Sequence, residues 1–205
     1  QRAMLASLRS AETRAAIKAK YRNAAELAQA VTPGYKITPA LDLIATRIET
    51  CLKRAERHLL INMPPQEGKS SLAAVWTVVR ALQLNPNRRI ILATYGDALA
   101  ETHSRNARDI ISRYGTNVID SMTGLPVPDQ IGLQLSPGSR KVSEWKVEGG
   151  NGGLAAVGVG GSITGRSADL FIIDDPFKNM MEADSAAHRA KIHDWFSNVV
   201  LTRLS

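Results

Sequence analysis

The sequence has 205 residues, of which 44% are apolar and 22% charged, and its net charge is +7. This composition excludes a disordered chain and is sufficient for one hydrophobic core, as a single domain or as one domain with a small appendage. No apolar run approaches the roughly 20 residues that cross a bilayer, and the N-terminus lacks the apolar segment of an export signal. The single cysteine, Cys51, excludes an internal disulfide and indicates a reducing, intracellular location.

The charge is unevenly distributed along the chain. Residues 1–60 contain 11 basic and 5 acidic side chains, a net charge of +6, whereas residues 61–205 have a net charge of +1. A basic lobe attached to a nearly neutral core predicts a polyanionic partner. A solvated helical face is an equally good interpretation of the charge alone.

The first 60 residues predict two helices. Apolar residues follow a loose helical period over residues 4–30, and Pro33 and Gly34 end that pattern. A second helix is expected to begin with Thr38 as N-cap and Pro39 in its first turn. We therefore expect a helical N-terminal extension, residues 1–57, in front of a core formed by residues 58–205.

The remaining sequence predicts alternating strands and helices. Short apolar runs predict strands at residues 58–63, 89–94 and 170–173, and a hairpin at 142–147 and 154–159. Helices are expected at residues 72–84, 97–114 and 185–204, and residues 116–140 form an irregular excursion. Strands that are almost wholly apolar are typical of a mostly parallel sheet covered by helices on both faces, which is an α/β fold.

A phosphate-binding loop is predicted between the first strand and the next helix. The sequence Gly68-Lys69-Ser70 follows an apolar strand and opens a helix, which is the context that such a loop requires. Amides at a helix start have no intrahelical acceptors, and phosphate oxygens can accept from them. Lys69 is expected to contact the β and γ phosphates of ATP, and Ser70 to bind Mg²⁺. The residues expected to surround the phosphates are Pro65, Gln66, Glu67, Gly68, Lys69, Ser70 and Ser71.

Two carboxylates follow the last apolar strand. Asp174 and Asp175 come directly after residues 170–173, at the sheet edge where open α/β folds bind ligands. Consecutive strand residues point to opposite faces, which favours different roles for the two side chains. We expect Asp174 to bind Mg²⁺ and Asp175 to polarise the attacking water. The alternative is an acidic turn before Pro176.

A glycine-rich segment at residues 158–165 precedes the carboxylate strand and ends at Arg166. Phosphoryl transfer develops negative charge on the equatorial oxygens, which a planar cation stabilises. Arg166 is therefore a candidate arginine finger. An ion pair with Asp169 or with the acidic strand end is an equally good interpretation.

These motifs together resemble the N-terminal ATPase domain of the large terminase subunit of tailed bacteriophages. The resemblance covers nearly the whole chain and is specific through the combination and order of its segments. The segments that carry it are residues 61–71, 89–108, 152–175, 175–179 and 195–204.

The resemblance implies an additional-strand (ASCE, RecA-like) P-loop fold and ATP hydrolysis that moves double-stranded DNA into a procapsid. It implies a homo-oligomeric ring on the portal protein, with the small terminase subunit as a further partner, in the host cell cytoplasm. Lys69 and Ser70 match the P-loop pair, Asp174 and Asp175 match the metal and base positions, and Arg166 matches the arginine that reaches a neighbouring subunit. Arg105 and Arg108 are candidates for DNA contact. The family layout also places Tyr35 and Thr38 near the adenine base.

The chain departs from the family pattern at several points. Met63 replaces the first glycine of the P-loop motif, and Gln66 replaces an arginine that many relatives carry. The family's coupling motif and C-terminal nuclease do not occur in these 205 residues, which suggests an ATPase domain with weak turnover in isolation. A helicase-like nucleic-acid translocase and a non-catalytic DNA-binding or assembly module with a degenerate P-loop remain alternatives, and a small-molecule kinase is a poorer one.

Overall fold

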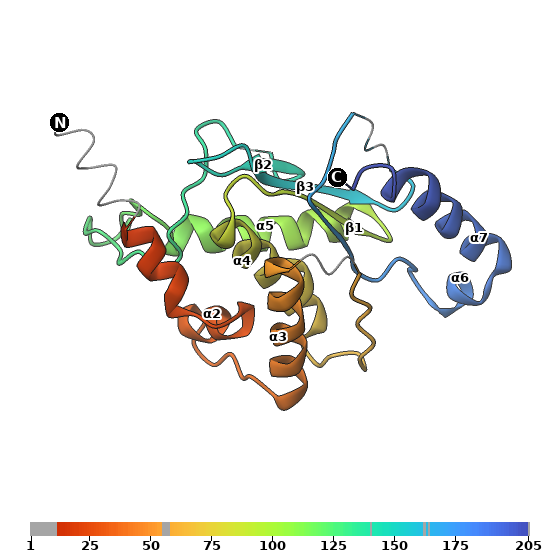
Figure 1. Ribbon diagram of the computed structural model, residues 1–205, viewed down its shortest axis with the longest axis horizontal. Helices are drawn as coiled ribbons and strands as arrows, with labels where there is room; N and C mark the ends of the chain where they lie inside the picture. The colour runs from red at the N-terminus through yellow and green to blue at the C-terminus, as the bar shows by residue number, and fades with distance from the viewer. Residues whose placement is uncertain (1–11, 55–57, 140, 162, 164, 205) are drawn as a thin grey trace.

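The computed structural model describes residues 12–54, 58–139, 141–161, 163 and 165–204 (Figure 1). A four-stranded sheet has the order β2-β3-β1-β4. Strand β1 (Arg89–Thr94) pairs in parallel with β3 (Gly153–Gly158) on one side and with β4 (Leu170–Ile173) on the other. Strand β2 (Glu144–Lys146) is antiparallel to β3. The expected α/β class with a mostly parallel sheet and a hairpin is confirmed.

Helices cover both faces of the sheet. One face packs against η1 (Ser71–Trp76, a π-helix), α4 (Thr77–Leu84) and α5 (Asp97–Tyr114). The other face packs against α7 (Ala186–Trp195) and η2 (Phe196–Val200), where Trp195 stands edge-on to Phe171 with ring centroids 5.9 Å apart. The alternation of buried side chains along β1 divides the strand between these two cores, as a sheet covered on both faces requires.

The N-terminal helices share the larger core with the sheet. Buried residues of α2 (Ala24–Val31) and α3 (Pro39–Lys53) belong to the same hydrophobic cluster as those of η1, α4 and β1. Thr38 caps α3 as expected, because its side chain accepts a hydrogen bond from the Leu41 amide at 3.3 Å. The expected boundary between residues 57 and 58 adjoins residues 55–57, which lie outside the described residues.

The strand expected at residues 58–63 does not form. Residues 58–64 have no regular secondary structure, although Ile61 and Met63 pack at the margin of the larger core. The sheet ends at β4 on this side, so an edge strand is present, but Leu60 is 94% exposed and the segment buries too little apolar surface to hold it in the sheet. The apolar run was therefore a misleading strand signal.

Two helix predictions also need correction. The first expected helix, residues 4–30, is helical at 12–20 and breaks at 21–23, where Asn23 caps α2 by accepting from the Ala25 and Glu26 amides at 3.0 and 3.1 Å. Residues 1–11 lie outside the described part. The last expected helix, residues 185–204, is α7 and η2 only, and it follows a short helix α6 (Met180–Asp184) that Asn179 caps.

A buried ion pair joins the N-terminal helices to the helix that follows the predicted phosphate-binding loop. Arg80 on α4 is 1% exposed and donates to both carboxylate oxygens of Glu49 on α3, at 3.0 and 2.7 Å. The same guanidinium donates to the main-chain carbonyls of Lys18 and Tyr21, at 3.0 and 2.9 Å. Arg80 therefore donates to carbonyls at the C-terminal end of the helix at 12–20 and fixes α3 against α4.

No helix in the described residues combines the length and apolar character needed to span a membrane.

Replacing Glu49 by alanine is expected to lower the free energy of unfolding by about 3–5 kcal/mol, because it leaves the buried Arg80 charge without its carboxylate. Urea denaturation measures the change. Lys53→Ala is the control, because Lys53 contacts the same carboxylate at 2.8 Å but is 54% exposed. The control should lose less than about 1 kcal/mol, and equal losses in both variants would contradict the assignment.

Candidate nucleotide-binding site

The predicted phosphate-binding loop is a tight turn that leads directly into a helix. Gln66 and Gly68 have positive φ angles of 65° and 83°. The helix begins at Lys69 and continues through η1 and α4 to Leu84. The Leu72 amide donates to the Gly68 carbonyl at 3.0 Å. The amides before it in the first turn have no intrahelical acceptor and can donate hydrogen bonds to an anion. A π-helical stretch directly behind such a turn is common at functional sites.

The loop meets the acidic end of β4. Lys69 Nζ lies 3.0 Å from Asp175 Oδ1, although the two residues are 106 positions apart in the sequence. Main-chain hydrogen bonds hold this strand end against β1: the Asp174 amide donates to the Ala93 carbonyl at 2.9 Å, and the Tyr95 amide donates to the Asp175 carbonyl at 3.0 Å. The expected proximity of the loop and the acid pair is therefore observed, although the loop does not leave a strand.

Asp174 is buried beside the loop, whereas the side chain of Asp175 is 52% exposed. Burial raises the pKa of Asp174, but interactions with His103 and Ser70 and the positive charge of Lys69 outweigh it and keep the pKa below its ordinary value of 3.8. The carboxylate is therefore ionised at neutral pH. Asp175 has a positive φ of 46°, a strained conformation for a residue other than glycine.

Ser70 and Asp174 fit a magnesium ion that shares its other ligands with phosphates and water. Mg²⁺ prefers oxygen ligands and is commonly held by one or two protein groups together with substrate phosphates. One oxygen of Asp174, Oδ2, is buried and has no hydrogen-bond partner in the described part of the chain. Within the same residues no group of three or more His, Cys, Asp or Glu side chains could bind a metal by itself, so the nucleotide would have to complete the coordination.

A pocket of about 360 Å³ adjoins the loop at Ser71. Tyr35 lines it and stands edge-on to Trp76, with ring centroids 6.4 Å apart. Burial raises the pKa of Tyr35, and its buried hydroxyl has no partner among the described residues. Asn106 and Asp109 of α5 add polar groups to the wall, while Thr38 is not part of it.

Arg166 does not reach the loop of its own chain. Its guanidinium donates to Glu144 Oε2 at 3.0 Å, and Glu144 belongs to β2, at the opposite edge of the sheet from β4. Asp169, the partner that the sequence suggested, instead binds Arg89 at 2.6 Å. Arg166 is 39% exposed at its side chain and lies at a surface.

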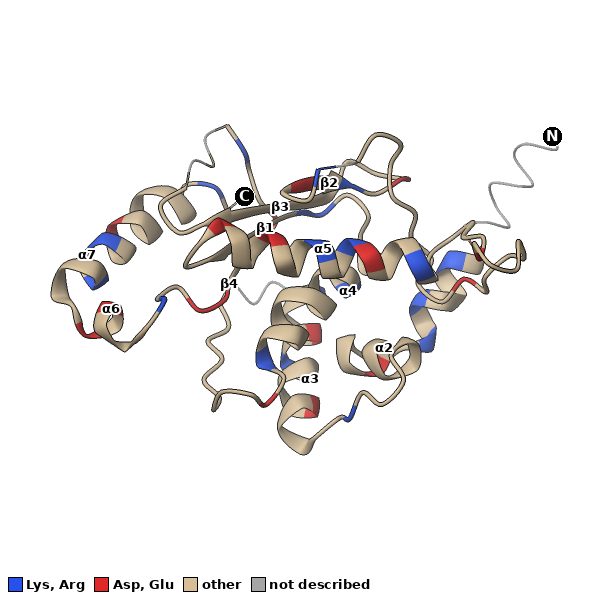
Figure 2. Ribbon diagram, turned by 180° about the vertical axis from the view of Figure 1, so that it is seen from behind, with Lys and Arg blue, Asp and Glu red and all other residues tan. Residues whose placement is uncertain are grey.

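The two arginines of α5 that were expected to contact DNA differ in exposure. Arg105 is exposed, whereas Arg108 is partly buried and lies 3.7 Å from Asp109. Figure 2 shows basic and acidic residues interspersed on this helix. Of these two arginines, Arg105 is the more exposed and therefore the better candidate for contact with a phosphate backbone.

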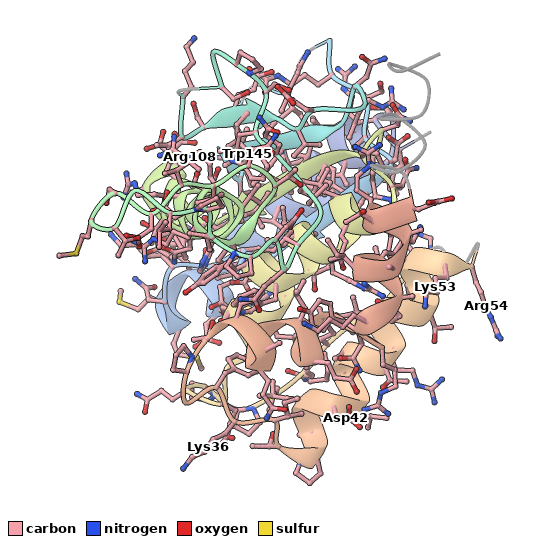
Figure 3. All side chains as sticks on the ribbon, turned by 90° about the vertical axis from the view of Figure 1, so that its left-hand side faces the viewer. Lys36, Asp42, Lys53, Arg54, Arg108 and Trp145 are labelled. Atoms are coloured by element: carbon pink, nitrogen blue, oxygen red, sulfur yellow. The ribbon has the colours of Figure 1, made fainter. Side chains whose placement is uncertain are left out.

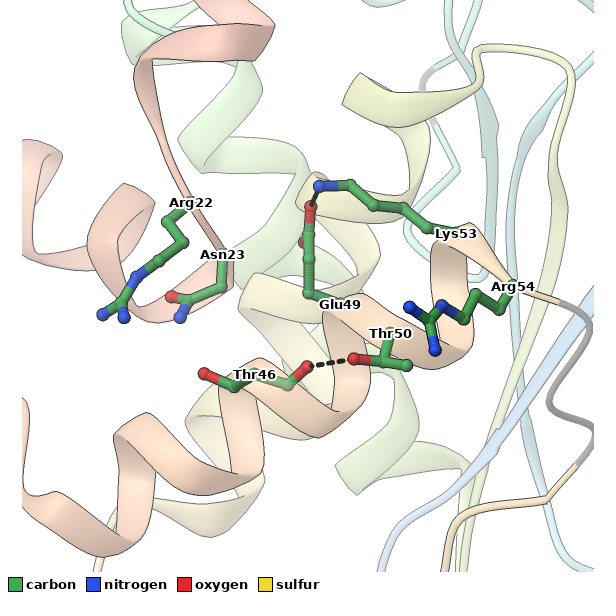
Figure 4. Close-up of a pocket in the computed structure, with 7 residues that line it drawn as sticks. All are labelled: Arg22, Asn23, Thr46, Glu49, Thr50, Lys53 and Arg54. Atoms are coloured by element: carbon green, nitrogen blue, oxygen red, sulfur yellow. Dashed lines mark hydrogen bonds and ion pairs between the residues drawn. The ribbon is translucent and has the colours of Figure 1, made fainter.

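A second pocket, of about 250 Å³, lies between the N-terminal segment and α3 (Figure 4). The Glu49 carboxylate in its wall forms ion pairs with Arg80 and Lys53. The side chain of Asn23 accepts a hydrogen bond from the Ala25 amide in the first turn of α2. These contacts hold the helices together, so we assign this pocket a structural role.

Sequence reasoning missed His103, which faces Asp174 from α5. A histidine on an amphipathic helix carries no signal of a distant partner, and only the packing of α5 against β1 and β3 reveals the contact.

No protein-family model matches the chain, and a search of curated proteins finds no match.

The left-handed conformation of Gly68 predicts a specific loss of stability. Gly68→Ala should lower the free energy of unfolding by about 1–2 kcal/mol, because a Cβ disfavours positive φ. Gly34→Ala is the control for the backbone effect alone, since Gly34 has the same φ of 83° and open space around it. A neutral Gly68→Ala beside a destabilising Gly34→Ala in chemical denaturation would contradict the loop conformation.

Proposed function

We propose that this chain is the ATP-hydrolysing domain of a viral large terminase subunit, which uses ATP to move double-stranded DNA into a procapsid. The observation that carries the proposal is the contact between Lys69 and Asp175, with Ser70 and Asp174 directly beside them. A helix-initiating lysine that meets two strand-end carboxylates is the arrangement that ATP hydrolysis needs. The motif order along the chain supports the terminase assignment.

In this proposal the loop amides and Lys69 bind the β and γ phosphates, and Lys69 exchanges Asp175 for phosphate oxygens. Ser70 and Asp174 would hold Mg²⁺, which neutralises charge on the phosphates when bound. Asp175, released from Lys69, accepts a hydrogen bond from the attacking water. The water oxygen bonds to the γ-phosphorus while the bond to the β–γ bridging oxygen breaks. The proton of the water passes by way of Asp175 to the released phosphate, and ADP leaves with the bridging oxygen.

The pocket beside Ser71 is where we propose that the nucleoside binds. Its entrance adjoins the loop, and Tyr35 and Trp76 supply aromatic surface for a base. Tyr35 Oη and the polar groups of Asn106 and Asp109 supply hydrogen-bonding partners. These features match the few polar groups in an otherwise apolar cleft that are typical of ligand pockets.

Arg166 would act on a neighbouring subunit's nucleotide in a homo-oligomeric ring. Its position at the sheet edge opposite β4, paired with Glu144, is compatible with action between subunits rather than within one. Such a ring would also contact the portal protein and the small terminase subunit. We accordingly expect weak phosphate release from the isolated chain.

Lys69→Ala is expected to reduce ATP binding by at least about tenfold, because it removes the cation for the β and γ phosphates. Its effect on the free energy of unfolding should stay below about 1 kcal/mol, since its partner is half exposed. Titration with a fluorescent ATP analogue and Mg²⁺ measures the binding. Lys146→Ala is the matched control, because Lys146 is an exposed lysine of β2, next to Trp145 (Figure 3) and at the opposite edge of the sheet from β4.

Absence of Mg-ATP binding by the unsubstituted chain would overturn the proposal and favour a non-catalytic module. ATP hydrolysis that single-stranded nucleic acid stimulates more strongly than double-stranded DNA would favour a helicase-like translocase.

Arg105→Ala is expected to weaken double-stranded DNA binding equally for all sequences and to reduce the slope of log affinity against log salt by about 1, because one phosphate contact is lost. Arg105→Lys retains the charge and should keep the slope. Fluorescence anisotropy with two unrelated duplexes at several salt concentrations measures both quantities. An unchanged slope in Arg105→Ala would remove this helix from the DNA interface.

A further inference from the structure

Two buried polar atoms face each other beneath the proposed magnesium position. His103 Nε2 and Asp174 Oδ2 are 3.4 Å apart, and the two side chains are 12% and 4% exposed. Both atoms are buried without a hydrogen-bond partner in the described part of the chain, and their separation is slightly longer than the roughly 2.7–3.2 Å of an ordinary N–H···O hydrogen bond. Buried polar atoms are nearly always satisfied in native proteins. A movement of a few tenths of an ångström would satisfy both atoms at once.

The helix that carries His103 is held firmly on the sheet. Ser104, the next residue, is fully buried, donates to the Val142 carbonyl and accepts from Trp145 Nε1 at 2.9 Å. About two turns earlier in the helix, Asp97 Oδ1 accepts from the Gly158 amide at 2.6 Å. These contacts fix the rotation of α5, so the imidazole is presented to Asp174 by a rigid element rather than by a loop.

The carboxylate of Asp174 is approached from two elements. Ser70 interacts with it from the first turn of the helix behind the loop, and His103 approaches Oδ2 from α5. A carboxylate on a strand end can rotate about χ2, because that torsion is broad. A donor at Oδ2 would restrict the rotation and leave the remaining lone pairs directed at the Ser70 side of the site.

We infer that His103 is a positioning residue for Asp174: with its proton on Nε2, the imidazole donates to Oδ2 and holds the carboxylate in the orientation that binds Mg²⁺ together with Ser70. This inference rests on the proposed function, because it assigns a role within the same site. Groups that orient metal-binding side chains in this way typically contribute about 10–100-fold to metal affinity.

The test compares His103→Phe, which keeps a planar ring without a donor, with His103→Gln, whose amide can donate. A fluorescent ATP analogue is titrated at a series of Mg²⁺ concentrations, and the Mg²⁺ concentration for half-maximal binding is measured. We expect an increase of about tenfold for His103→Phe and no more than about twofold for His103→Gln. His188→Phe, at an exposed histidine of α7, is the control and should match the unsubstituted chain.

Thermal unfolding without nucleotide and analogue binding in the presence of EDTA separate positioning from a general structural role. The inference requires that His103→Phe raise the Mg²⁺ concentration for half-maximal binding. The unfolding temperature and the affinity for the analogue in EDTA should stay close to those of the unsubstituted chain. If the unsubstituted chain binds the analogue with Mg²⁺ but His103→Phe has the same Mg²⁺ requirement, the inference alone is overturned. An equal shift in His103→Phe and His103→Gln overturns the donor role, and failure of the unsubstituted chain to bind overturns the proposed function as well.

Discussion

The guanidinium of Arg80, on the helix that follows the predicted phosphate-binding loop, is buried, and Glu49, Gln83 and two main-chain carbonyls accept its hydrogen bonds. An isolated charge at this depth would be strongly unfavourable. The ion pair therefore requires α3 and the end of the helix at residues 12–20 to dock on α4. That docking completes the larger core and determines where the loop emerges relative to the sheet.

The site at the end of β4 depends on that placement. Lys69 starts the helix that continues into α4, and it reaches Asp175 because β4 ends beside β1 at the same sheet edge. The positive φ angles of Gln66 and Asp175 lie on the two sides of this contact. Strain in residues other than glycine is retained where surrounding structure determines the conformation, which fits two segments that must approach the same ligand.

Sequence patterns predicted most elements and several local details. The capping role of Thr38, the extent of α5 and the hairpin of β2 and β3 all follow from short-range chemistry. The strand expected at 58–63 does not form, because an apolar run does not reveal how much of its surface the fold will bury, and Leu60 stays exposed. Of the interpretations that the sequence left open for Arg166, the ion pair with Asp169 is not observed, since Arg166 binds Glu144 and Asp169 is bound by Arg89.

By itself the sequence determined the α/β class, the helix-initiating lysine and the pair of carboxylates after an apolar strand, because these are properties of local spacing and side-chain type. Only the tertiary structure decided which side chains meet across long separations. It brings Glu49 to Arg80, Asp175 to Lys69 and His103 to Asp174. Such pairings depend on how rigid helices pack against the sheet, and side-chain periodicity carries no information about the element that a given face will contact.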